Sequence, residues 1–241
     1  MPRSARIESS TGIYHVMIRG NNKQTIFWDS EDYQKYLFLA KEKVNQKSCF
    51  LYSWCLMPNH IHLLIKEKQE SLSMVMMKIQ TAFVQWYNKK YDRSGHVFHD
   101  RFKSQSVEDP TYFLRVFRYI HRNPLEAGLC KRMEDYPFSS YAYYFRNPGY
   151  QEHDVILNLM EKDALERYHF EKDENVDDFL DINNLCEFTD SQIKKMILDT
   201  GFVKELSGIK ALPRERQIEM FSLLSKVGIP YQRIRKLIDK Q

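Results

Sequence analysis

The residues with the clearest chemical potential in this chain are His60 and His62, which are separated by one apolar residue. They lie in the segment 57–65, MPNHIHLLI, whose alternation is typical of a β-strand with successive side chains on opposite faces. Both imidazoles are therefore predicted on one face, with the intervening apolar residues buried on the other. Two neutral imidazoles side by side can bind one divalent cation, so this strand is a candidate metal site.

A second chemically suggestive pair, Tyr119 and Asn123, lies on a predicted helix that begins after Asp109. Tyr119 falls on the flank of the apolar stripe of this helix, and Asn123 is its neighbour one turn further on. Pro124 is predicted to end the helix. Asn123 would then lie at the C-terminal end, where the helix dipole favours a nearby cation.

The combination of these residues predicts phosphoryl-group chemistry. A metal held by His60, His62 and the amide oxygen of Asn123 could polarise a phosphodiester and stabilise charge developing on its oxygens. Tyr119 could then attack phosphorus and form a covalent phosphotyrosine. One phosphodiester replaces another in this step, so no nucleotide fuel is needed, and the chain indeed has no G-x-x-x-x-G-K phosphate-binding loop.

The elements that must position these residues follow the order β-α-β-β-α-β, the ferredoxin-like split βαβ arrangement. The patterns predict strands near 14–20, 50–56, 57–65 and 103–107, and helices near 30–46, with Ser30 as N-cap, and 72–91. A further helix over 110–123 carries Tyr119. The predicted fold class is α+β, an antiparallel sheet with helices on one face, plus a C-terminal helical region.

Charge divides the chain into three parts. Residues 1–150 carry 22 Lys and Arg against 14 Asp and Glu, residues 151–190 carry 3 against 13, and residues 191–241 carry 11 against 5. We predict a catalytic domain over 1–148, a loose and solvated acidic helical connector over 149–190, and a small basic helical module over 191–241. Two basic regions suit a polyanionic partner such as nucleic acid.

Composition indicates the compartment. The hydrophobic content of 43% supports a packed core, and the four cysteines show no C-x-x-C spacing, which is typical of reduced thiols. The start of the sequence has no apolar leader pattern, and no run approaches about eighteen apolar residues. We therefore predict a cytoplasmic protein with no membrane association.

Binding of a nucleic-acid strand requires cations along a groove and aromatic surfaces on which bases stack. The candidate cations are Arg19, Arg101, Lys103, Arg115 and Arg122, and the candidate stacking residues are Phe98 and Tyr112. The segment 213–240 is typical of a helix-turn-helix or, alternatively, of a basic packing appendage. Its last predicted helix carries Arg233, Arg235, Lys236 and Lys240.

Several motifs occur in a fixed order: WCLMPNHIHLLI at 54–65, GHVFHDRFKS at 95–104, YIHRNPLEAGL at 119–129 and YPFSSY at 136–141. Over about residues 10–145 the chain resembles the single-tyrosine HUH transposases, in particular the REP-associated tyrosine transposase branch. This resemblance implies cleavage of single-stranded DNA, often near hairpins, with a 5′-phosphotyrosine, a free 3′-OH and Mg²⁺ or Mn²⁺. It assigns His60 and His62 to the HUH pair, Tyr119 to the nucleophile and Asn123 to the third ligand. Members act as monomers or homodimers.

Some alternatives stay open. Mg²⁺ prefers oxygen ligands whereas imidazole suits Mn²⁺ and heavier ions, so the residues alone do not fix the metal. With a two-residue loop between the paired strands, Cys55 opposes His62 and could be a zinc ligand. With a three-residue loop it opposes Ile61 and lies in the core, which we favour. The alternative functions are a rolling-circle or relaxase-type nickase and a non-catalytic DNA-binding regulator.

Overall fold

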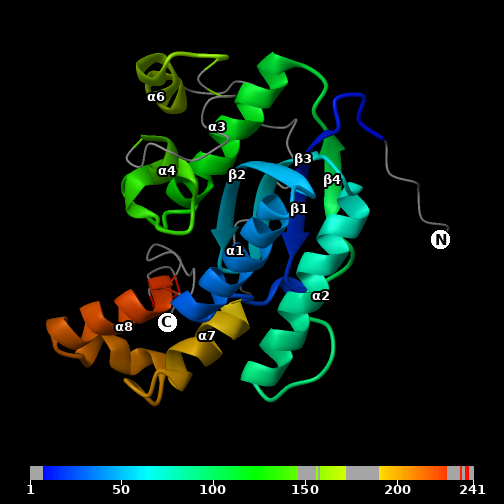
Figure 1. Ribbon diagram of the computed structural model, residues 1–241. Helices are drawn as coiled ribbons and strands as arrows, with labels where there is room; N and C mark the ends of the chain where they lie inside the picture. The colour runs from blue at the N-terminus through cyan, green and yellow to red at the C-terminus, as the bar shows by residue number, and fades with distance from the viewer. Residues whose placement is uncertain are drawn as a thin grey trace.

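The N-terminal part of the molecule has the predicted element order, β-α-β-β-α-β (Figure 1). The computed structural model describes residues 8–145, 156, 158–171, 190–226, 234 and 237–238. The elements of the N-terminal part are β1 (Ile13–Arg19), η1 (Asn21–Lys23), α1 (Ser30–Asn45), β2 (Cys49–Met57), β3 (His60–Glu67), α2 (Leu72–Lys90) and β4 (Lys103–Ser106). They are followed by α3 (Pro110–Glu126), η2 (Met133–Asp135) and α4 (Tyr141–Phe145).

The four strands form one antiparallel sheet in the order β2-β3-β1-β4. This is the strand order of the split βαβ arrangement, so the predicted α+β, ferredoxin-like fold class is confirmed. β2 and β3 form a hairpin with a two-residue loop, because Met57 pairs with His60. Cys55 therefore lies opposite His62, which is the register of the two-residue alternative.

Each face of the sheet has its own core. The first core includes Ile61 and Leu63 of β3 and the buried residues of α1 and α2, so these two helices share one face. The second core includes Leu64 of β3 and the apolar stripe of α3. The prediction of helices on one face thus holds for α1 and α2 only, because α3 is amphipathic and covers the opposite face, on which the histidines lie.

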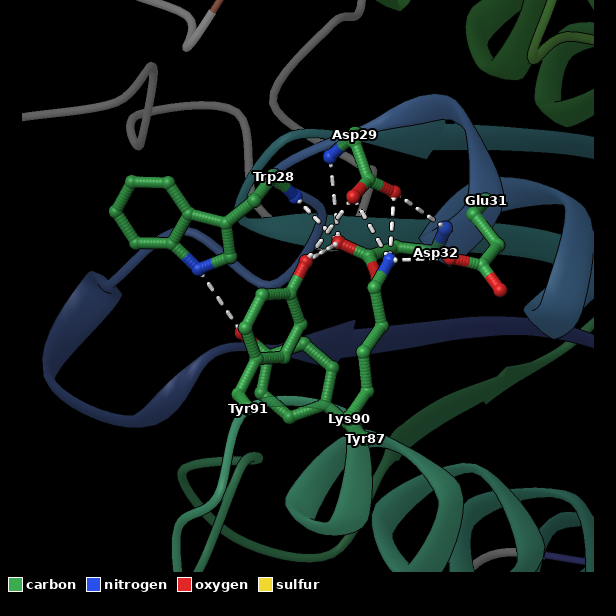
Figure 2. Close-up of polar contacts among 7 residues, drawn as sticks. All are labelled: Trp28, Asp29, Glu31, Asp32, Tyr87, Lys90 and Tyr91. Atoms are coloured by element: carbon green, nitrogen blue, oxygen red, sulfur yellow. Dashed lines mark hydrogen bonds and ion pairs between the residues drawn. The ribbon is translucent and has the colours of Figure 1, made fainter.

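The start of α1 is held by charged and polar contacts to the end of α2 (Figure 2). Asp29, rather than the predicted Ser30, is the N-cap, and it forms a reciprocal capping box with Asp32. The ammonium group of Lys90 lies 2.8 Å from a carboxylate oxygen of each of these aspartates. This cluster ties two elements that are about sixty residues apart in the sequence.

The helix that carries Tyr119 begins as predicted, with Asp109 as N-cap and Pro110 as its first residue. It does not end at Pro124, as predicted, but continues to Glu126. Gly128, with φ of +69°, ends it: the backbone N–H of Gly128 and of Leu129 donate to the carbonyls of Leu125 and Pro124. Pro124 removes only one backbone hydrogen bond from the helix. The bonds from Gly128 and Leu129 satisfy carbonyls of the last turn.

The acidic segment is not the loose connector that we predicted, at least over 162–171. α6 (Lys162–Phe170) packs beside α3, with Leu165 and His169 fully buried (Figure 1). The guanidinium groups of Arg118 and Arg122 on α3 donate to backbone carbonyls at the end of α6. A helix with few apolar residues, of which two are buried, gives only a weak sequence signal for packing. The prediction of a solvated connector therefore followed from the acidic charge of the segment.

The C-terminal helices have a third core. α7 (Asp190–Asp199), η4 (Leu206–Ala211) and α8 (Arg214–Lys226) share it with Ile234, Leu237 and Ile238. The first predicted domain boundary, near residue 148, and the basic residues of the predicted last helix, Arg233, Arg235, Lys236 and Lys240, lie outside the described residues. The three-part division and the helix-turn-helix therefore stay predictions. No helix among the described residues is long and apolar enough to cross a membrane.

Candidate functional site

The two histidines of β3 lie on the same face of the sheet, as predicted, and each belongs to a row of side chains that crosses it. Arg19 of β1 and Met57 of β2 flank His60, while Met17 and Cys55 flank His62. The two imidazole rings lie 4.9 Å apart, centroid to centroid, and are nearly perpendicular. Both are buried between the sheet and α3.

Hydrogen bonds determine which nitrogen of each ring can accept a cation. His60 Nδ1 lies 2.7 Å from Oδ1 of Asn59, which can only accept, so the proton is on Nδ1 and Nε2 keeps its lone pair. His62 Nδ1 lies 3.1 Å from Nε2 of His15 on β1. With the proton on His62 Nδ1, its Nε2 also keeps a lone pair, and that atom is buried without a hydrogen-bond partner among the described residues.

An orphan nitrogen of this kind is unusual, because buried polar atoms are nearly always hydrogen-bonded. Metal-binding imidazoles, in contrast, donate their second N–H to a neighbouring acceptor and keep the other nitrogen for the ion. His60 and His62 both have this arrangement. Burial, with smaller contributions from His60 and His15, holds the pKa of His62 well below its ordinary value. The ring is therefore neutral at physiological pH and able to bind a cation.

Tyr119 lies against this pair, as the sequence predicted. Its ring contacts His62 edge to face at 5.5 Å between centroids and His15 at 5.8 Å. The tyrosine is 7% exposed, so most of the phenol is enclosed while part of it reaches the surface. The phenol and the imidazoles thus come from two elements, α3 and β3, and meet on one side of the sheet.

Asn123 lies one turn beyond Tyr119 on α3, and its position is held by its own helix. The amide nitrogen of Asn123 donates to the carbonyl of Tyr119 at 2.8 Å. This bond uses the nitrogen and leaves the amide oxygen as the atom that could bind a cation. The structure therefore fixes the amide beside the nucleophile candidate, whereas its distance from the histidines stays untested.

Cys55 is a core residue, although it lies opposite His62. The side chain is fully buried among apolar residues, and burial, with a contribution from Cys130, raises its pKa well above the ordinary value. A protonated thiol is a poor ligand for zinc. In the described part of the chain no three His, Cys, Asp or Glu side chains gather as a metal site. An ion bound by the histidines would therefore need oxygen ligands from the asparagine, the substrate or water.

Arg19 is the cation that lies nearest to the histidines in the register of the sheet. It pairs directly with His60 across β1 and β3. Its Nε and Nη2 atoms are buried and have no hydrogen-bond partner among the described residues. A guanidinium group left unpaired beside two imidazoles is suited to bind a phosphate, since its fork of N–H donors matches two phosphate oxygens.

Two of the other predicted cations lie at the same edge of the sheet. Lys103 of β4 pairs with Met17, in the same row as His62, and its side chain is exposed. Arg101 lines a cavity of ≈ 410 Å³ together with Phe98, one of the predicted stacking residues. The backbone N–H of His99 in this segment donates to the carbonyl of Arg19. Phe98 is buried in the first core, and Gln80 and Val84 of α2 also line its cavity, so this cavity lies on the α2 side of the sheet. Lys103 is the predicted cation of this edge that lies in the same row as His62.

Arg122 and Arg115 differ from these three. Arg122 forms an ion pair with Glu126 at 2.9 Å and donates to the carbonyls of His169 and Glu171, so it holds α6 against α3. Arg115 lies over the ring of Tyr112, 5.9 Å from its centroid. Both could be assigned to DNA from their sequence positions, but the structure gives Arg122 an internal role. Their part in DNA binding stays a prediction.

Sequence reasoning missed His15, which orients His62. Its position two residues before Met17 places it on the site face, but only the register of β1 against β3 shows which residue it meets. Burial lowers the pKa of His15 to about 3, so it too is neutral at physiological pH. In the sequence, the indication of a role for His15 was its position on the same strand as Arg19.

Comparison with known proteins agrees with this site. Residues 8–123, which include every histidine of the site and both Tyr119 and Asn123, match the family described as IS200-like transposases. This part of the chain is therefore similar to the IS200-like transposases.

Two relatives confirm the resemblance to the REP-associated branch. A curated Haemophilus influenzae protein, named provisionally as a REP-associated tyrosine transposase, is 28% identical over 99 residues. The match covers 36% of this chain and 56% of the relative, so the chain spans about half of that protein's length. The structure of a REP-associated tyrosine transposase bound to a REP hairpin matches with a TM-score of 0.52 and 17% identity. It covers 64% of this chain and 90% of that chain, and at this identity it shows the fold alone.

Proposed function

We propose that this protein cleaves and transfers single-stranded DNA through a covalent intermediate on Tyr119, at sites associated with hairpins. The observation that carries the proposal is the edge-to-face contact between Tyr119 and His62, whose Nε2 is buried without a partner. The similarity of residues 8–123 to the IS200-like transposases supports the reaction class, and the solved relative bound to a REP hairpin supports the substrate.

The proposed reaction is a transesterification. The phenolic oxygen of Tyr119 attacks phosphorus, the bond from phosphorus to the 3′ oxygen breaks, and the 5′ phosphate remains on the tyrosine. The phenolic proton passes to solvent, and a proton returns to the leaving oxygen to give a free 3′-OH. In the reverse direction a 3′-OH attacks the phosphotyrosine, so the same residues join strands without a nucleotide cofactor.

Each residue of the site has a role in this step. His60, His62 and the amide oxygen of Asn123 would hold Mg²⁺ or Mn²⁺, which, when bound, supplies a positive charge that polarises the phosphodiester. Arg19 binds a phosphate oxygen through its unpaired guanidinium nitrogens. Asn123 also anchors the helix backbone at Tyr119. Lys103 and Arg101 bind phosphates at the edge of the sheet.

A cleavage assay on an end-labelled hairpin oligonucleotide with a single-stranded extension tests the proposal. We expect a covalent protein–DNA adduct in the presence of Mn²⁺, a released fragment that a polymerase can extend, and neither product with EDTA. Tyr119→Phe abolishes the adduct and keeps DNA binding. Tyr112→Phe, on the same helix, is the matched control and retains the adduct.

Two results would contradict the proposal. An adduct that persists in Tyr119→Phe would place the nucleophile elsewhere. DNA binding by the native protein with no adduct under any divalent metal would support a regulator instead.

A further inference from the structure

Trp28 is exposed yet held rigidly, which is an unusual combination. Its side chain is 51% exposed. The indole N–H donates to the hydroxyl of Tyr87 at 2.9 Å, and the backbone N–H donates to Asp32 at 2.7 Å (Figure 2). Tyr87 belongs to the first core and is itself buried. The structure therefore maintains a large apolar surface in contact with solvent, in one orientation.

This tryptophan lines a cavity of ≈ 320 Å³. Such a volume falls within the range of about 300–1,000 Å³ that is typical of small-ligand sites. The wall opposite the indole includes Tyr33 and Phe138, whose rings stack at 3.7 Å between centroids. The remaining lining residues are Asp29, Ser30, Pro58, Leu129, Asp135, Tyr136 and Pro137.

The cavity is adjacent to the metal-binding strand. Pro58, which lines it, belongs to the two-residue loop that leads directly into His60. The carbonyl of Pro58 accepts hydrogen bonds from the backbone N–H groups of Ile26 and Phe27, immediately before Trp28. The tryptophan and the candidate active site are therefore joined through three consecutive residues of that loop and strand, Pro58, Asn59 and His60.

The charge of the cavity restricts its occupant. The described residues that line it include no cationic side chain and two carboxylates, that of Asp135 and that of Asp29, which is paired with Lys90. Carboxylates repel a phosphate, but they accept hydrogen bonds from the amino groups of cytosine, adenine or guanine. The exposed indole of Trp28 suits the face of a base, which stacks on it regardless of sequence, whereas Tyr33 already stacks on Phe27 and Phe138. A nucleobase fits both features of the lining.

We propose that this cavity binds one unpaired nucleobase of the DNA strand, stacked on Trp28, within a few nucleotides of the phosphate that Tyr119 attacks. The inference rests on the proposed function, because it supplies the substrate. It adds a second kind of contact to the site: Arg19, Arg101 and Lys103 bind the backbone, whereas the cavity holds a base and favours one with an amino group. This contact would select where along the strand cleavage occurs.

Equilibrium binding of the full-length protein to a fluorescent hairpin oligonucleotide, without metal, tests the inference. Trp28→Ala weakens binding about 5- to 100-fold, the loss typical of one stacked base. Trp28→Phe, which keeps an aromatic face, stays close to the native affinity. Phe38→Ala is the matched control, since Phe38 is 60% exposed on α1, the helix that begins just after Trp28, but does not line the cavity. It leaves binding unchanged.

A scan with abasic nucleotides locates the base and separates this contact from general damage. One abasic position near the cleavage site should weaken binding to the native protein as much as Trp28→Ala does, and should not weaken binding to Trp28→Ala further. Trp28→Ala should keep the native salt dependence, because no phosphate contact is lost, whereas Arg19→Gln flattens it.

The outcomes distinguish the two proposals. The proposed base site is wrong if Trp28→Ala binds DNA as tightly as the native protein. It is also wrong if the loss of affinity in Trp28→Ala adds to the loss caused by every abasic position. In both cases adduct formation on Tyr119 is unaffected. If the native protein neither binds nor cleaves the oligonucleotide, the proposed function fails and the base site fails with it. Native Tyr119 adduct formation by Trp28→Ala at saturating DNA shows that the tryptophan positions substrate and is not needed for the chemistry.

Discussion

The molecule contains two buried, hydrogen-bonded histidine pairs that differ in what surrounds them. On the sheet, His15 and His62 lie 3.1 Å apart, and each has a second ring nitrogen with no partner among the described residues. Behind α3, His121 and His169 lie 2.9 Å apart, and both of their remaining nitrogens are bonded, to Ser140 and to the carbonyl of Leu165. All four histidines are buried, but within the described part of the chain only the second pair has hydrogen-bond partners for all of its ring nitrogens.

The second pair forms a consistent chain of donors and acceptors. Ser140 donates to His121, His121 donates to His169, and His169 donates to the carbonyl of Leu165. The chain links the segment after η2, the tyrosine helix and α6, so its role is to hold these elements together. The first pair has an incomplete chain that ends at a nitrogen facing Tyr119's side of the sheet. Buried ring nitrogens without a hydrogen-bond partner indicate a ligand, whereas nitrogens with partners indicate a structural role.

Replacing one histidine of each pair by leucine should have different consequences. The larger expected effect is the loss of activity when His62, on the sheet, is replaced. His62→Leu removes a proposed metal ligand, so we expect strand cleavage in Mn²⁺ to fall about 100-fold or more. His62→Leu leaves His15 Nε2 without its partner, but it also removes a buried, unsatisfied nitrogen, so the loss of stability should be less than about 1–3 kcal/mol. A cleavage assay and a thermal unfolding curve of the same preparation measure both effects. Cleavage at the native rate would show that His62 binds no essential ion.

A smaller loss of function is expected from His15, which touches His62 and not the ion. His15→Phe keeps the ring shape and removes the acceptor for the His62 N–H, so Mn²⁺ affinity should fall about 10- to 100-fold. Titration of the unfolding temperature with Mn²⁺ measures it, because an ion that binds only the folded state stabilises it by an amount that grows with the logarithm of the ion concentration divided by Kd. Saturating Mn²⁺ should restore cleavage. Failure to restore it would indicate that His15 takes part in the chemistry itself.

The histidine strand and the tyrosine helix could be predicted from sequence because their patterns are local. A period of two places His60 and His62 on one face, and a helical period places Tyr119 and Asn123 on one side of α3. The element order then brings the two together, since α3 follows the last strand and must cover the open face. Periodicity and connectivity were sufficient for this much of the fold and site.

The features that sequence reasoning missed depend on pairing between distant segments. The partner of His15 follows from the register of β1 against β3, and the rigidity of Trp28 follows from Tyr87, on another helix. Pro124 was expected to end α3, but the backbone bonds that complete the helix are made by Gly128 and Leu129 beyond it. In each case the local pattern was correct and a contact outside it determined the result.

The matching substitution in the second pair should reduce stability and not chemistry. His121→Leu leaves His169 Nε2 without its partner, while the Ser140 hydroxyl keeps its bonds to the backbone of Trp54, and this costs about 1–3 kcal/mol of unfolding free energy. Cleavage per folded molecule should stay near the native rate, since no contact to substrate is lost. Urea unfolding and single-turnover cleavage separate the two quantities. If His121→Leu lost as much cleavage as His62→Leu and kept native stability, the second pair would not have the purely structural role that distinguishes it from the first.

Acidification provides the smallest test of the satisfied pair. Burial lowers the pKa of His169 to about 4 and holds the pKa of His121 well below its ordinary value. Between about pH 6.5 and pH 4 the unfolded chain therefore binds protons that the folded chain does not, so stability falls as pH decreases through this range and is level above it. We expect a loss of about 1 kcal/mol per buried histidine between pH 6.5 and 5.5. Urea unfolding at these pH values should show a shallower dependence for His169→Gln than for the native protein. An equal dependence in both would show that His169 does not titrate on unfolding, and its pairing with His121 would not explain the stability of α6 on α3.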